Sequence, residues 1–109
     1  MRSEEDIRRD LKLFQKLYQR LLIQKEREVG LARNGKMLSP GEIREMRELE
    51  ANIEALFDRN SNITNFRIRK LFESEKSKYE LSMKGWKNRK DYSLQAFEKF
   101  SKEKKLNEK

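Results

Sequence analysis

The fold of this chain is decided at Leu38-Ser39-Pro40-Gly41-Glu42-Ile43, which carries the signals of a helix start. Ser39 is a favoured N-cap, Pro40 follows at the first helical position, where its missing N–H costs nothing, and Glu42 completes a capping box. Leu38 and Ile43 form a hydrophobic staple around the cap. The sequence therefore predicts a helix over residues 40–57 with one apolar face, made of Ile43, Met46, Leu49, Ile53, Leu56 and Phe57.

Upstream of this signal, a second helix is predicted over residues 4–29. Ser3 is its candidate N-cap, and the acidic residues that follow suit the positive end of a helix dipole. Apolar residues then recur at steps of four and three, as in a coiled-coil seam: Ile7, Leu11, Phe14, Tyr18 and Leu21. The seam fades toward residues 30–35, which we expect to form a loop. Because this loop is short, the two helices should pack as an antiparallel hairpin.

Downstream, residues 58–62 are rich in side chains that hydrogen-bond their own backbone, so they should break or kink the helix and cap the next one. We expect further helices over residues 62–84 and 92–103, with Gly85 as the interruption and Asp91 as the cap of the last helix. Whether the helices on either side of residues 58–62 are separate or form one kinked rod is left open. The charged residues 101–109 are expected to be a disordered tail.

These elements predict an all-α fold: an antiparallel helical hairpin extended by one or two further helices, in a single domain over residues 1–100. The composition agrees, because the chain has 42% charged residues, 4 Gly and 1 Pro and lacks the turn residues that an all-β fold needs. Only 35% of the residues are apolar, so the core is thin and the seam of the first helix is a candidate for a homo-oligomeric or partner interface. Its residues are Leu11, Phe14, Tyr18 and Leu21.

The residue types that are missing argue against an enzyme. The chain has no Cys and no His, which removes disulfides, thiol nucleophiles and the usual general base near neutral pH. We therefore expect no catalysis, no cofactor, no metal site and no small-molecule substrate. No apolar run approaches a membrane span, and the acidic N-terminus is unlike a targeting peptide, so a cytoplasmic protein that does not enter membranes is expected.

Positive charge is concentrated in the second half of the chain. Residues 1–58 hold 12 basic and 12 acidic side chains, whereas residues 59–109 hold 15 basic and 7 acidic ones. This asymmetry indicates sequence-nonspecific binding of DNA or RNA through phosphates. The candidate nucleic-acid-binding residues are Arg67, Arg69, Lys70, Lys84, Trp86, Lys87, Arg89 and Lys90, with Trp86 able to stack on a base. The alternative is a protein-interaction or scaffolding module whose basic half docks an acidic partner.

The segment Ile63-Thr64-Asn65-Phe66-Arg67-Ile68-Arg69-Lys70-Leu71 resembles the end of the helical domain in GINS subunits of the replicative helicase complex. The matching positions are Ile63, Arg67, Lys70 and Leu71, and the resemblance covers residues 10–72. It implies a helical, non-catalytic subunit that packs beside sister subunits in a DNA replication complex. The chain departs from the family in having no room for the small β-rich domain of GINS subunits.

Overall fold

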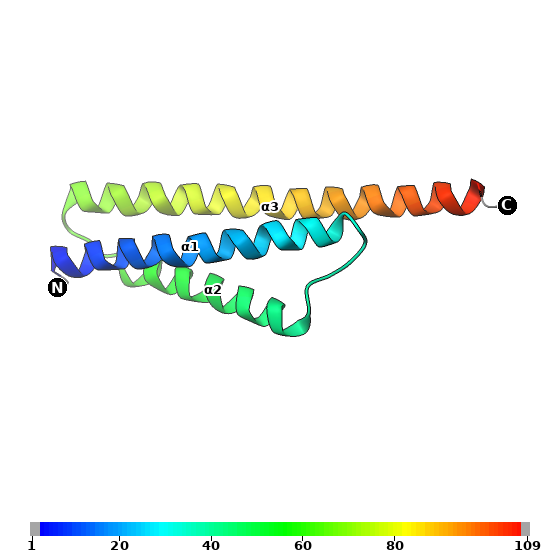
Figure 1. The fold of residues 1–109 in the computed structure, drawn as a ribbon. Helices are drawn as coiled ribbons and strands as arrows, with labels where there is room; N and C mark the ends of the chain where they lie inside the picture. Colours follow the sequence, from blue (N-terminus) through cyan, green and yellow to red (C-terminus); the bar gives the residue numbers. More distant parts are fainter. Residues whose placement is uncertain (1–2, 108–109) are drawn as a thin grey trace.

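The computed structural model describes residues 3–107, with side chains described for residues 3–103. These residues form three helices and no strand: α1 (Glu4–Ala32), α2 (Pro40–Arg59) and α3 (Phe66–Asn107). Figure 1 shows that α1 and α3 run in the same direction, that α2 runs against both, and that α3 continues past the end of α1. The expected small all-helical bundle is confirmed. It is elongated, with extents of 69 × 25 × 16 Å.

Two serine caps begin the first two helices where the sequence predicts them. The backbone N–H of Asp6 donates to Ser3 Oγ over 3.2 Å, and that of Glu42 donates to Ser39 Oγ over 3.3 Å. The Ser39 hydroxyl also donates to the Glu42 carboxylate over 3.0 Å. This hydrogen bond is the main cause that holds the pKa of Glu42 below its usual range, and Arg27 beside the same carboxylate lowers the pKa further.

The loop expected at residues 30–35 is shorter than predicted, because α1 continues to Ala32. Val29 and Ala32 are buried, so the last turn of α1 gains packing that favours helix beyond residue 29. The chain then turns at Gly35, whose φ of 68° lies in the left-handed region. The N–H of Lys36 donates back to the carbonyl of Leu31 over 2.9 Å, which closes the end of the helix as in a Schellman motif.

The expected break at residues 58–62 is confirmed, and it separates two distinct helices. α2 extends to Arg59, where the Asn60 side chain donates to the carbonyl of Leu56 over 2.8 Å and ends the helix. The next helix begins at Phe66 and not at residue 62. The backbone N–H of Arg67 donates to Asn65 Oδ1 over 3.0 Å, so Asn65 acts as the cap.

The predicted division of the remaining chain into helices 62–84 and 92–103 is wrong, because α3 is one helix of 42 residues. Neither Gly85 nor Asp91 interrupts it. A single Gly costs a helix only about 1 kcal/mol, and α3 is held on both sides of Gly85 by buried residues, Tyr79 before it and Ser93 after it. The segment 101–109, expected to be disordered, continues α3 as far as Asn107, and residues 108–109 lie outside the described part of the chain.

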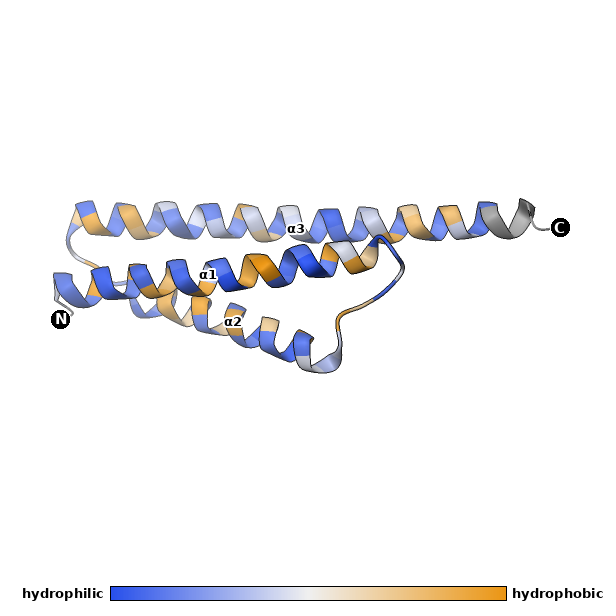
Figure 2. Cartoon of the chain, in the orientation of Figure 1, coloured by the Kyte–Doolittle hydropathy of each residue, from blue (hydrophilic) through white to orange (hydrophobic). Residues whose placement is uncertain are grey.

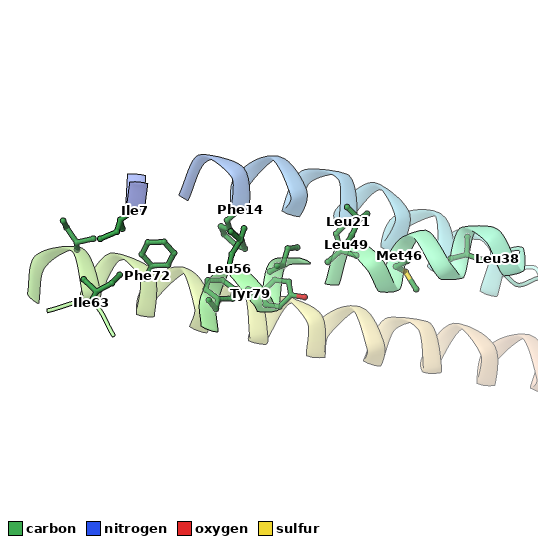
Figure 3. Packing of buried hydrophobic residues seen from close by; sticks show 13 residues of the cluster. Ile7, Phe14, Leu21, Leu38, Met46, Leu49, Leu56, Ile63, Phe72 and Tyr79 are labelled. Atoms are coloured by element: carbon green, nitrogen blue, oxygen red, sulfur yellow. The ribbon is translucent and has the colours of Figure 1, made fainter. Parts of the chain in front are cut away.

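The core is a row of aromatic rings between the three helices. Phe14 of α1 lies 5.0 Å from Phe57 of α2 and 6.2 Å from Tyr79 of α3, measured between ring centroids, and Phe57 lies 6.5 Å from Phe72. Aliphatic residues extend the row in both directions, from Ile7 and Ile63 at one end to Met46 and Leu38 at the other (Figure 3). Because each helix contributes to this one cluster, the chain folds as a single unit.

The seam of α1, expected to be a partner interface, is part of this core. Phe14 and Leu21 are 2% and 0% exposed, and Leu11 and Tyr18 are half-buried against the cluster. The prediction is wrong for Phe14 and Leu21, because α2 and α3 cover this part of the seam: Phe14 packs against Phe57 of α2 and Tyr79 of α3. Phe14 and Leu21 are therefore out of reach of a partner in the folded chain, whereas Leu11 and Tyr18 keep part of their surface.

A buried carboxylate joins α1 to the end of α2. Asp10 is 5% exposed and accepts from Arg59 Nη2 over 2.9 Å and from Asn60 Nδ2 over 2.9 Å. A charge of this kind is stable inside a protein only when it is paired and hydrogen-bonded. The network therefore ties the register of the α1–α2 hairpin to the turn that follows it.

Candidate partner-binding surface

The predicted nucleic-acid-binding residues all lie on α3, but they do not share one face. Arg67, Arg69, Lys70, Lys84, Lys87 and Arg89 are exposed, whereas Trp86 and Lys90 are half-buried. An α-helix turns once in about 3.6 residues, so neighbours such as Lys84, Lys87 and Arg89 point in different directions. The eight side chains are spread around the helix in two groups, and a single flat phosphate contact cannot engage them all.

Trp86 and Lys90 belong to the side of α3 that faces α1. Trp86 follows the buried Tyr79 by seven residues, which places both on the same side of the helix. The Arg89 guanidinium lies over the indole at 4.8 Å from its centroid, and Lys90 Nζ lies 3.5 Å from the Glu28 carboxylate of α1. Trp86 is therefore a half-buried residue on the α1 side of α3, with the Arg89 guanidinium over its ring.

Four acidic residues of α3 are gathered on one line of the helix, whereas Glu103 lies on another side of it, eleven residues after Tyr92. Glu73, Glu80, Asp91 and Glu98 follow one another at steps of seven, eleven and seven residues, which are spacings that return to the same side. Glu75 lies apart from this line and is half-buried, and its Oε1 lies 3.7 Å from Lys78 Nζ. On the flank away from this line, basic side chains therefore outnumber acidic ones, although Lys78 of that flank pairs with Glu75.

That flank, which we call the basic strip, has two rows with an eleven-residue spacing. Such a spacing keeps residues nearly in line along a straight helix. One row is Arg67, Lys78, Arg89 and Phe100, and the other begins Lys70, Leu81 and Tyr92. Leu71 lies at its edge. Within residues 67–100 no carboxylate lies on these rows or between them, and the next eleven-residue step of the second row reaches Glu103.

Small residues lie between the two rows of the basic strip. They are Ser74, Gly85 and Ala96, again eleven residues apart. A Cβ built at Gly85 would meet nothing within 4 Å, so no other part of the described chain covers the middle of the strip. Small residues in a line between larger ones leave a shallow channel in which the backbone of another helix can approach closely.

The basic strip also exposes large apolar side chains. Leu71, Leu81, Tyr92 and Phe100 are 53%, 70%, 74% and 61% exposed. Figure 2 shows that apolar residues recur along α3 as far as the part that continues beyond α1. Single exposed apolar residues are common in proteins, but a row of them along one flank of a helix marks a binding surface.

At its far end the basic strip opens into a cavity of about 330 Å³ between α3 and the end of α1. Phe97 forms part of its wall and packs against Gly35 of the α1–α2 turn, where there is no side chain to displace it. Two arginines are the charged residues of the lining: Arg33, which follows the last residue of α1, and Arg89 of α3. The lining consists of Val29, Arg33, Arg89, Tyr92, Ser93, Ala96, Phe97 and Phe100.

Sequence reasoning missed half of the basic strip because it placed a break at Gly85. A common side exists for Lys78, Leu81, Tyr92 and Phe100 only if the helix is continuous. In a continuous helix, the eleven-residue spacing is the signal that identifies them. Of the predicted site residues, Arg67, Lys70 and Arg89 belong to the strip. The GINS-like positions Arg67, Lys70 and Leu71 are exposed there, whereas Ile63 is buried.

The described part of the chain shows neither a metal-binding cluster nor a helix that could span a membrane. Residues that the structure describes include no group of three or more carboxylate, imidazole or thiol side chains placed to hold a metal ion. None of the three helices, over those same residues, has an apolar stretch of the length that crossing a bilayer requires. No protein family, curated protein or solved structure matches this chain.

Proposed function

We propose that this chain is a non-catalytic helical adaptor whose basic strip binds an acidic, amphipathic helix of a partner protein. The observation that carries the proposal is the composition of the strip: cations, exposed apolar side chains and a line of small residues, with no carboxylate among them over residues 67–100. Each feature has a counterpart in such a helix. Its carboxylates would meet Arg67 and Lys78, its apolar face would cover Leu81 and Tyr92, and its backbone would approach over Gly85.

The exposed apolar side chains favour a protein over a nucleic acid. Phosphate binding draws its affinity from cations and counterion release, and it gains nothing from Leu71 or Leu81. The cations of the first row are also sparse, since an eleven-residue step along a helix is about 16 Å. Protein interfaces, in contrast, combine an apolar centre with arginine and aromatic residues, which is the mixture found here.

A nucleic acid remains the second candidate, because the second half of the chain holds the entire surplus of positive charge. In that case Lys84 and Lys87, exposed beside the acidic line of α3, would contact phosphates together with Arg67, Arg69 and Lys70. The resemblance to GINS subunits agrees with either candidate, since it proposes a helical subunit that packs beside other proteins on DNA.

The experiment is affinity capture on the immobilised chain from an extract of the source cell, with and without nuclease, followed by crosslinking and mapping of the captured segment. An adaptor retains its partner after nuclease treatment, and the crosslinked segment is an acidic amphipathic helix. Loss of every captured protein on nuclease treatment would assign the surface to nucleic acid. A captured segment without acidic amphipathic character would also overturn the proposal.

Gly85→Gln sharpens this test because it separates folding from binding. Replacing a mid-helix Gly by a good helix former stabilises the helix by about 0.5–1 kcal/mol, while the long side chain fills the channel of the basic strip. The variant should therefore unfold at higher temperature and yet lose the partner. Gly41→Gln is the matched control, because a Cβ at Gly41 of α2, away from the strip, also meets nothing within 4 Å. It should gain stability and keep the partner.

A further inference from the structure

The cavity at the far end of the basic strip differs from the rest of the strip. Elsewhere the strip has only the shallow channel over Ser74, Gly85 and Ala96, whereas here α3 and the end of α1 border an open cavity of about 330 Å³. For comparison, a protein cavity of about 150 Å³ holds a benzene molecule. The cavity therefore has room for an aromatic or large aliphatic side chain and part of the backbone that carries it.

The lining of this cavity is apolar and aromatic with a positive rim. Tyr92 and Phe100 are largely exposed at its mouth, and Phe97, seated on Gly35, gives it a wall that is fixed by the turn. Arg33 and Arg89 are both exposed, and no acidic residue lines the cavity with them. Two guanidinium groups on an apolar cavity favour a carboxylate, which arginine binds with paired hydrogen bonds.

We infer that this cavity is the anchor site for the partner helix and takes a bulky apolar side chain with a carboxylate beside it. The inference rests on the proposed function, since it names the part of the acidic amphipathic helix that is bound most specifically. Anchoring of this kind follows the usual energetics of interfaces, in which one or two large side chains in a pocket carry most of the affinity. The remaining strip then sets orientation and register.

A small carboxylate tests the cavity without knowledge of the partner. The probe is 3-phenylpropionate, titrated into the ¹⁵N-labelled full chain up to tens of millimolar and followed by amide chemical shifts. Binding in the millimolar range should move the amides of residues 29–36 and 88–100 and leave those of α2 unchanged. The neutral 3-phenylpropionamide should bind at least about fivefold more weakly, because it loses the charge-assisted hydrogen bonds to arginine.

Two variants assign the effect to the arginines. Arg33→Gln and Arg89→Gln should each weaken 3-phenylpropionate by about fivefold, whereas Arg44→Gln, on the exposed face of α2, should leave it unchanged. Arg89 also covers Trp86, so Arg33→Gln keeps the test valid if Arg89→Gln disturbs that packing. Equal affinity for the acid and the amide, shifts centred on α2, or no shifts at all would each overturn the inference.

The same variants separate failure of the anchor from failure of the adaptor. If Gly85→Gln abolishes capture of the partner but the double variant Arg33→Gln with Arg89→Gln does not, the adaptor stands and the anchor site is wrong. If 3-phenylpropionate binds as expected while no protein survives nuclease treatment, the cavity binds an apolar carboxylate and the proposed function is wrong.

Discussion

Gly35→Ala probes the contact that fixes the far half of α3 to the rest of the chain. Gly35 has a φ of 68°, and a Cβ at this position would overlap the ring of Phe97. The substitution therefore imposes two separate penalties. One is backbone strain at residue 35, and the other is displacement of an aromatic ring that belongs to a different helix.

The two penalties have comparable size. A left-handed conformation costs an L-residue about 1–2 kcal/mol. Full burial of a Phe side chain is worth about 1.5–3 kcal/mol, and Phe97 is half-buried, so expelling its ring should cost about 1–2 kcal/mol. We expect Gly35→Ala to lower the free energy of unfolding by about 2–4 kcal/mol in total.

The assay is urea unfolding of the wild type, Gly35→Ala, Phe97→Ala and the double variant. Once the ring is removed, only the strain remains, so Gly35→Ala should cost about 1–2 kcal/mol less in the Phe97→Ala background than in the wild type. Gly30→Ala is the control and should be stabilising by about 0.5–1 kcal/mol, since it lies within α1 and its Cβ has open space. Equal costs of Gly35→Ala in both backgrounds would refute the docking of Phe97 on the turn.

Four further outcomes are expected from single substitutions. Gly85→Ala should raise the free energy of unfolding by about 1 kcal/mol in urea melts, and a loss of stability would contradict a continuous α3. Ser39→Ala should lower the free energy of unfolding by about 1 kcal/mol and move the pKa of Glu42 back toward its usual value in an NMR titration. Because that pKa is lowered in the folded state, the contribution of Glu42 to stability is present above its unfolded pKa of 4.5 and is lost as the pH falls. Asp10→Ala should cost about 1–3 kcal/mol by removing the buried acceptor of the hairpin network, and a neutral result in urea melts would show that the network contributes nothing. Burial, with smaller effects of nearby carboxylates, raises the pKa of Tyr79, so stability should decline above the unfolded pKa of about 10, and melts at increasing pH should show a shallower decline for Tyr79→Phe.

Local signals in the sequence were sufficient for the helix starts. Ser3 and Ser39 cap their helices as expected, because a cap depends on residues within one turn of it. The break after α2 was predictable for the same reason, since Asn60 and Ser61 bond to carbonyls three or four residues before them. The apolar positions of α1 and α2 were also identified correctly as buried faces.

Tertiary structure decided what local signals could not. Gly85 has the local preference of a break, yet α3 passes through it because packing against α1 on both sides outweighs the cost of one Gly. Packing of α2 and α3 on α1 buried Phe14 and Leu21, and the continuity of α3 turned Trp86 and Lys90 toward α1 and aligned Arg67, Leu81, Arg89 and Tyr92 on one flank. Composition by itself determined that α3 carries excess positive charge. Which side of the helix presents that charge depends on long-range packing, which no spacing of a few residues encodes.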